Sequence, residues 1–253
     1  MKRQRDRRLE SERRAYDESR MWERGHALHQ RFICVHECVN SMRAENYYYD
    51  LVARNVPGKD VLEYGCGDGW NCEYLLNHNP HTLVGIDISQ KGLAHAQMKF
   101  GHSAGFSVMD AHAMGLAGDS FDTVVGRAIL HHLDFERAVS EIRRVLKPGG
   151  VALFTEPLGD NPLAKLWRLC TPAVRTKSER PLSRATLQWA DRQFSRSHHM
   201  FANLVSTPIA VACSLLHARP DCVPLRMADR IDVALACLPI RTWMRMVVLC
   251  WQK

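Results

Sequence analysis

A strand-like run that passes straight into closely spaced glycines constrains the fold of this chain most strongly. Residues 61–70 read VLEYGCGDGW, with glycine at positions 65, 67 and 69. Because glycine has no Cβ, a backbone of this kind can turn sharply and come very close to a ligand or another segment. A helix is expected to begin directly after the glycines, over residues 70–77. A strand, a glycine loop and a helix in this order are typical of nucleotide-binding sheets.

Strand and helix patterns alternate along the rest of the middle of the chain. Asp134 is expected to cap an amphipathic helix that ends at Lys147-Pro148-Gly149-Gly150. Another helix is expected over 90–100, and strands are expected over 61–64, 82–87, 106–109, 121–126 and 151–155. This alternation predicts a parallel sheet with helices on both faces. Sheets of this type bind ligands at the carboxyl ends of their strands.

The two ends of the chain have different patterns. Residues 1–31 are rich in Arg and Glu and predict a solvated helix or a partly disordered arm, whereas 32–56 predict a helix packed on the main domain. Beyond residue 157 we expect a long loop over 157–182, a helix over 183–191, a strand over 194–205, two apolar helices within 207–238 and a final strand over 244–251.

Composition places the chain among globular proteins. It is 46% hydrophobic and 24% charged, which is ordinary for a protein with a sizeable core. No apolar stretch reaches the roughly 18 residues that span a bilayer, and no secretory signal is visible at the N-terminus. The nine cysteines include no CxxC pair, which argues against a disulfide framework and a zinc ribbon. We therefore expect a cytoplasmic protein with reduced thiols and no metal site.

Charge is distributed unevenly along the sequence. The net charge is +4 over residues 1–31, −5 over 32–157 and +8 over 158–253. The basic last third suits a phosphorylated or otherwise anionic substrate, a membrane surface or nucleic acid, but it equally suits a solvated surface without a partner. Charge alone does not decide among these partners.

Three carboxylates are predicted to lie at successive strand ends beside the glycine loop. Glu63 directly precedes the loop, where it would repel a pyrophosphate and attract an ammonium group. Asp87 follows Gly65 by 22 residues, about the spacing at which an acidic residue binds ribose hydroxyls. Asp110 ends the third strand, where it can accept a hydrogen bond from an adenine amino group. A nucleoside that carries an amino acid, such as S-adenosylmethionine, matches this set.

Several stretches together resemble the class I S-adenosylmethionine-dependent methyltransferases. They are VLEYGCGDGW, GIDIS (85–89), VMDAHAM (108–114), FDTVVGRAILHHL (121–133) and VLKPGG (145–150). They are most similar to the small-molecule branch that includes ubiquinone/menaquinone-type enzymes. The later stretch EPLGDNPLAKLWR (156–168) is similar to a bacterial subgroup associated with natural-product or glycan pathways.

The resemblance implies an α/β fold, a Rossmann-like, mostly parallel seven-stranded sheet with an N-terminal helical arm and a helical insertion near the C-terminus. We divide the chain into a helical arm over 1–56, a cofactor-binding core over 57–157 and a substrate-side region over 158–253 that completes the same sheet. The cofactor would be S-adenosylmethionine. Its methionine part would be lined by Glu63, Gly65, Cys66 and Gly67, its ribose by Asp87 and Ile88, its adenine by Asp110 and Ala111, and its sulfonium by Arg127.

The candidate catalytic residues lie where the acceptor should bind. His131 and His132 follow the fourth strand, and Glu156 ends the fifth. Methyl transfer depends mainly on alignment of the acceptor with the methyl group. A histidine could in addition deprotonate a hydroxyl, since its pKa lies near neutrality. Helix capping or packing by the histidines, and burial of Glu156 against a structural arginine, are the alternatives.

These observations predict methylation of a small acceptor, lipophilic or of natural-product type, with O-, N- and C-methylation all open. An RNA methyltransferase is one alternative, supported by the basic termini. Methyltransferases that act on a nucleobase amino group usually carry an Asn/Asp-Pro-Pro-aromatic motif after the fourth strand. This sequence has Arg127-Ala128-Ile129-Leu130 there, which argues against that subclass. A non-catalytic cofactor-binding module is the other. The N-terminal arm offers a surface for association of two copies of the chain.

Overall fold

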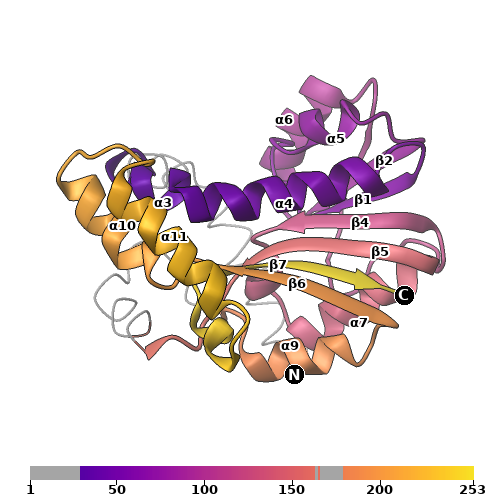
Figure 1. The fold of residues 1–253 in the computed structure, drawn as a ribbon. Coiled ribbons are helices and arrows are strands. Elements are labelled where there is room, and N and C mark those ends of the chain that lie inside the picture. Colours follow the sequence, from indigo (N-terminus) through magenta and orange to yellow (C-terminus); the bar gives the residue numbers. More distant parts are fainter. Residues whose placement is uncertain (1–28, 163–164, 166–178) are drawn as a thin grey trace.

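A computed structural model of the chain describes residues 29–162, 165 and 179–253. The described strands form one seven-stranded sheet of order β3-β2-β1-β4-β5-β7-β6. β1 to β5 are parallel, and β7 runs antiparallel to both β5 and β6. The predicted mostly parallel α/β sheet of seven strands is therefore confirmed (Figure 1).

The strands lie close to their predicted positions. They are β1 Asp60–Tyr64, β2 Thr82–Asp87, β3 Gly105–Val108, β4 Phe121–Arg127, β5 Leu146–Pro157, β6 Arg196–Ala202 and β7 Met246–Gln252. β5 begins earlier than expected because Leu146 already pairs with Phe121 before a register shift brings Val151 opposite Thr123. β6 is shorter than expected, since Asn203 turns the chain with a positive φ of 72°.

The helices also follow their sequence signals. They are α3 Ile33–Glu37, α4 Val39–Asn55, α5 Cys72–Leu76, α6 Gln90–Phe100, α7 Phe135–Val145, α9 Arg184–Asp191, α10 Ser206–Leu215 and α11 Val223–Leu235, with 3₁₀ turns η1 Leu130–His132 and η3 Pro239–Trp243. Asp134 caps α7 as predicted, by accepting a hydrogen bond from the Arg137 amide. Extended backbone at Cys38 divides the single helix expected over 32–56 into α3 and α4.

Each face of the sheet is covered by helices. Alternate residues of a strand point to opposite faces, so neighbouring Val124 and Val125 of β4 enter different core clusters. One cluster includes residues of α7 and α9, and the other includes residues of α4 and α5. In Figure 1, α4 crosses one side of the sheet while α7 and α9 lie on the other. This arrangement leaves the carboxyl ends of β1 to β5 facing a common edge.

The two insertion helices between β6 and β7 are anchored to α4. Asp229 of α11 accepts hydrogen bonds from Arg43 at 2.6 Å and from the Asn40 side chain at 2.9 Å. Asp232 accepts the backbone amides of 204–206, which begin α10. The predicted helical insertion is thus fixed against α4. No helix in the described part of the chain is long and apolar enough to cross a membrane. The arm proposed over 1–31 lies almost wholly outside the described residues.

Candidate active site

The glycine loop closes against the segment that follows β4. Gly65 has a φ of +76°, and a Cβ built on it would lie 2.6 Å from Cγ1 of Ile129. Both its conformation and its surroundings therefore require glycine. Gly67, with φ +55°, has nothing within 4 Å of the position of a Cβ, although it lines a cavity. The backbone at Gly65 thus approaches protein, and the backbone at Gly67 borders open space.

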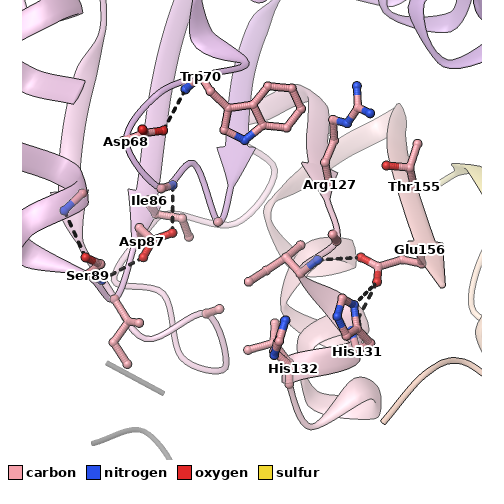
Figure 2. Close-up of a pocket in the computed structure, with 18 of the residues that line it drawn as sticks. Asp68, Trp70, Ile86, Asp87, Ser89, Arg127, His131, His132, Thr155 and Glu156 are labelled. Atoms are coloured by element: carbon pink, nitrogen blue, oxygen red, sulfur yellow. Dashed lines mark hydrogen bonds and ion pairs between the residues drawn. The ribbon is translucent and has the colours of Figure 1, made fainter. Parts of the chain in front are cut away.

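Asp87 ties the end of β2 to the glycine loop. Its Oδ2 accepts the Gly67 amide at 2.9 Å, and its Oδ1 accepts the Ser89 amide at 2.8 Å. Ser89 in turn caps α6 by accepting the Gly92 amide at 3.0 Å. Figure 2 shows Asp87 between the loop and Ser89, at the border of the cavity. The carboxylate therefore orders the loop as well as facing the space beside it.

Asp110 is held by a histidine that the sequence analysis did not single out. Its Oδ1 accepts both the backbone amide of His112 at 2.9 Å and ring atom Nδ1 at 2.7 Å. The Asp134 amide donates to Nε2 of the same ring at 2.8 Å. Since a carboxylate only accepts and an amide only donates, the proton of the neutral ring sits on Nδ1. His112 thus links Asp110 to the start of α7.

Glu63 and Cys66 lie beneath the loop and are not among the residues that line the cavity. The Glu63 side chain is buried and accepts a hydrogen bond from Sγ of Cys72 at 2.7 Å. Burial raises the pKa of Glu63 to about 7. The Cys66 thiol is also buried, close to Gly85 of β2. A direct contact of these two residues with the methionine part of a cofactor stays a prediction.

A strained turn after β4 gathers backbone amides around Glu156. Ala128 has a φ of +51°, a left-handed conformation that is uncommon for alanine. The turn directs the amides of Ile129 and Leu130 to Glu156 Oε1, at 2.9 and 2.8 Å. The His131 amide approaches Oε2 at 3.3 Å. Glu156 therefore holds the start of η1, and its partners are these amides and a histidine ring instead of the arginine considered above.

His131 is oriented by the same carboxylate. Its Nδ1 lies 2.8 Å from Glu156 Oε2, and the two side chains are 8% and 0% exposed. Because the carboxylate can only accept, Nδ1 carries the proton and Nε2 of the neutral ring keeps its lone pair. Figure 2 shows the ring of His131 between Glu156 and His132, whose ring centroid lies 4.1 Å away. This arrangement suits Nε2 for accepting a proton from a bound group.

Glu179 joins the two histidines at this end of the site. One donor atom from each of His131, His132 and Glu179 lies within 4.8 Å of the others, a grouping in which a metal ion could be held. The main-chain bond from the Arg180 amide to the His131 carbonyl, at 2.7 Å, brings Glu179 there. The expectation of no metal site stays a prediction.

Arg127 forms a clamp with α4. Its Nη2 contacts both carboxylate oxygens of Glu45, at 2.5 and 2.7 Å, and its Nη1 donates to the Tyr49 hydroxyl at 3.2 Å. The guanidinium carbon lies 4.8 Å from the ring centroid of Trp70 and 4.9 Å from that of Tyr48. Arg127 lines the cavity as predicted for a site residue, but its charge is paired with Glu45. Its proposed place near a sulfonium stays a prediction.

A single cavity of about 930 Å³ brings most of the predicted site residues together. The predicted residues that line it are Gly65, Gly67, Asp87, Ile88, Asp110, Ala111, Arg127, His131, His132 and Glu156. Glu45, Trp70, His112, Thr155, Arg245 and Met246 also line it and were not predicted. His112 lies in a quoted motif and its position beside Asp110 was the available signal. Glu45 and Arg245 are brought in by tertiary packing, which no local pattern marks.

Part of the chain is similar to known proteins. Residues 62–154 match the family model of a methyltransferase domain. Over these residues the chain is similar to class I methyltransferases. The chain is similar to a fatty-acid O-methyltransferase of Mycolicibacterium smegmatis, with 30% identity over 47% of this chain and 44% of the relative. It is also similar to phthiotriol/phenolphthiotriol dimycocerosates methyltransferase 1 of Mycobacterium ulcerans, with 30% identity over 54% and 52%.

The solved structures agree on the fold. The chain superposes on phosphoethanolamine N-methyltransferase 2 of Haemonchus contortus, solved in complex with S-adenosylhomocysteine, with a TM-score of 0.59 and 19% identity over 82% of this chain and 52% of the other. The chain spans about half the length of the curated relatives that it matches. The similarity to the family model covers residues 62–154, which hold β1 to β4 and most of β5.

The cavity fits S-adenosylmethionine, the cofactor that the sequence predicts. Gly67 borders open space where a Cβ would stand, next to Asp87 at the end of β2. Asp110 at the end of the segment after β3 is fixed by His112. A carboxylate at each of these two strand ends is suited to hydroxyl and amino donors of a nucleoside. The residues present are thus chemically compatible with the cofactor.

Proposed function

We propose that this protein transfers a methyl group from S-adenosylmethionine to a small lipophilic acceptor bound in the cavity. One observation carries the proposal. The same cavity is lined by Gly67, Asp87 and Asp110 beyond the ends of β1 to β3, and by His131 and Glu156 beyond the ends of β4 and β5. A volume of about 930 Å³ is near the upper end of the roughly 300–1,000 Å³ usual for ligand pockets.

The two groups of residues have different tasks in this proposal. The loop from Gly65 to Gly67 would hold the methionine part of the cofactor, Asp87 the ribose hydroxyls and Asp110 the adenine amino group. The bound cofactor supplies an electrophilic methyl group on a sulfonium. The protein contributes alignment of the acceptor with that methyl group, and exclusion of water by the surrounding walls.

His131 would accept a proton from the acceptor. With Nδ1 hydrogen-bonded to Glu156, the lone pair of Nε2 is available as a base. A hydroxyl acceptor must lose its proton to become a neutral methyl ether, and His131 would take that proton as the new bond forms. Glu156 is a positioning residue, because it acts through the ring of His131 and the amides of η1. This arrangement favours an acceptor whose proton leaves during transfer.

The acceptor end of the cavity supports a lipophilic ligand. Ile129, Leu133, Pro157 and Met246 contribute apolar side chains to its lining. Two relatives are named for fatty-acid and phthiotriol/phenolphthiotriol dimycocerosate substrates, which are lipidic. We also place the activity in the cytoplasm, as the free thiol state of the eight described cysteines suits a reducing compartment.

The test uses S-adenosylmethionine labelled in its methyl group and an extract of the source cells, separated after reaction into organic, RNA and protein fractions. We expect label in the organic fraction with the wild-type protein. Asp87→Ala should abolish it, whereas Asp221→Ala, which removes an exposed aspartate beyond α10, should not. Label confined to RNA or protein would contradict the proposal, as would label in the organic fraction that Asp87→Ala leaves unchanged.

A further inference from the structure

Arg245 is placed at the acceptor end of the cavity by the sheet itself. It immediately precedes β7, whose first residue Met246 pairs with Pro157 at the end of β5. Its backbone amide donates to the Asn203 carbonyl at 2.9 Å, and its carbonyl accepts the Leu158 amide at 2.9 Å. The main chain is thus fixed on both sides, and the side chain lines the cavity near the end of β5.

The guanidinium of Arg245 is held by neutral groups alone. Its Nη2 donates to the Val35 carbonyl at 3.1 Å and to the Ser41 hydroxyl at 3.3 Å, and lies 3.6 Å from the Met246 sulfur. Its Nε is buried and has no hydrogen-bond partner within the described residues. No carboxylate of the described chain lies within 4.0 Å of it. The charge is therefore held in the wall of the cavity without a counter-ion from these residues.

Three other arginines of the described residues have such a counter-ion. Arg43 pairs with Asp229 at 2.6 Å, Arg127 with Glu45, and Arg144 with Glu141 at 2.8 Å. Burial lowers the pKa of Arg245, which is the direction expected for a charge that desolvation disfavours. A buried charge that lacks a partner is strongly destabilising unless a ligand supplies one. Arg245, which lines the cavity, thus has an N–H donor without a partner among the described residues and a charge without a paired carboxylate there.

We infer that Arg245 binds an anionic oxygen group, a carboxylate or a phosphate, on the acceptor of the proposed methyl transfer. The planar guanidinium offers several N–H donors in a fork that matches such oxygens. Pro157 and Met246 beside it are apolar, as is Ile129 across the same cavity. One anchored charge in apolar surroundings selects an amphiphile with a single anionic end. This inference rests on the proposed function, because it assigns that acceptor a chemical class.

The test compares three ten-carbon probes that differ only at one end: decanoate, decyl phosphate and decanol. Each is titrated calorimetrically into protein saturated with S-adenosylhomocysteine. We expect at least one of the two anions to bind ten-fold or more tightly than decanol. The tighter anion shows whether a carboxylate or a phosphate is preferred. Equal binding of all three probes by the wild-type protein would overturn the inference without the use of any variant.

Variants then locate the anion at this residue. Arg245→Met should reduce anion binding to the level of decanol, and Arg245→Lys should keep part of the preference. Arg226→Met removes an exposed charge from α11 and should change nothing. An anion preference that survives in Arg245→Met would also overturn the inference. Binding of S-adenosylhomocysteine is measured in the same titrations. Its failure in the wild-type protein would contradict the proposed function and not the role of Arg245.

Discussion

Oε2 of Glu156 lies 2.8 Å from Nδ1 of His131, while Oε1 of the same carboxylate accepts the amides of Ile129 and Leu130. One buried side chain at the end of β5 therefore fixes both the ring of His131 and the backbone that carries it. The left-handed turn at Ala128 makes this possible, because it directs successive amides toward the carboxylate. This relationship defines the acceptor side of the proposed active site.

Replacement of Glu156 by glutamine should separate transfer from cofactor binding. The amide cannot accept from every donor that the carboxylate accepts, so His131 loses its fixed tautomer and orientation. We expect kcat to fall about 10²- to 10⁴-fold, the usual contribution of acid–base catalysis. The dissociation constant of S-adenosylhomocysteine should change less than about three-fold. Glu136→Gln, which alters an exposed residue of α7, serves as the control. A variant with the wild-type rate would exclude the positioning role.

Alanine at position 65 should destabilise the protein more than alanine at position 58. Both glycines have positive φ, +76° and +70°, so both substitutions impose backbone strain. Only at Gly65 does the new Cβ meet a neighbour, Ile129, at 2.6 Å, whereas Gly58 has open space. We expect a further loss of about 1–3 kcal/mol at position 65, from overpacking. Thermal unfolding of the two variants measures the difference, and equal melting temperatures would show that the contact is easily relieved.

Removal of the Glu63 charge should stabilise the ligand-free protein at alkaline pH. Burial raises the pKa of this carboxyl from 4.5 to about 7, so the folded state keeps a proton that the unfolded state releases. Glu63 therefore lowers the free energy of unfolding progressively as pH rises from 4.5 to 7, and the loss is complete above that range. We expect Glu63→Gln to gain up to about 3 kcal/mol over wild type at pH 8, and little at pH 4.

Urea unfolding at a series of pH values measures this gain. Glu73→Gln, which neutralises an exposed residue of α5, should give a curve parallel to that of the wild type. A parallel curve for Glu63→Gln would mean that the charged carboxylate is as stable in the folded protein as in water.

The clamp between Arg127 and Glu45 should hold α4 over the glycine loop. Their side chains are 13% and 22% exposed, so each loses a well-shielded partner when the other is replaced. We expect Arg127→Met and Glu45→Gln each to destabilise the protein by about 2 kcal/mol, and the double variant by clearly less than the sum. A double-mutant cycle measured by chemical unfolding checks this coupling. Additive effects would show that the pair contributes no interaction of its own.

Local sequence patterns predicted much of the fold. Residues 82–87 and 90–100 form β2 and α6 with the predicted bounds, because the short apolar run that ends at Asp87 and the Ser89 cap are local signals. The start of β5 was predicted too late. Leu146 belongs to the strand because it pairs with Phe121 of β4. Pairing between strands cannot be predicted from the local sequence of either strand alone.

The gathering of the candidate site residues around one cavity was predictable to the same extent, while their roles stay predictions. Asp87, Asp110, His131 and Glu156 lie at strand ends, and a parallel sheet brings strand ends to one edge. Their precise partners were not predictable, since the bond between Glu156 and His131 depends on the turn at Ala128. Arg245 comes from the segment before the last strand, and only the antiparallel pairing of β7 with β5 carries it to the cavity.

The structure of the protein in complex with S-adenosylhomocysteine tests the central claim most directly. The account predicts the ligand inside the cavity, with its ribose at Asp87, its adenine at Asp110 and its sulfur toward His131 and Glu156. An adenine at the His131 end, or a ligand outside this cavity, would contradict the division into a cofactor side and an acceptor side.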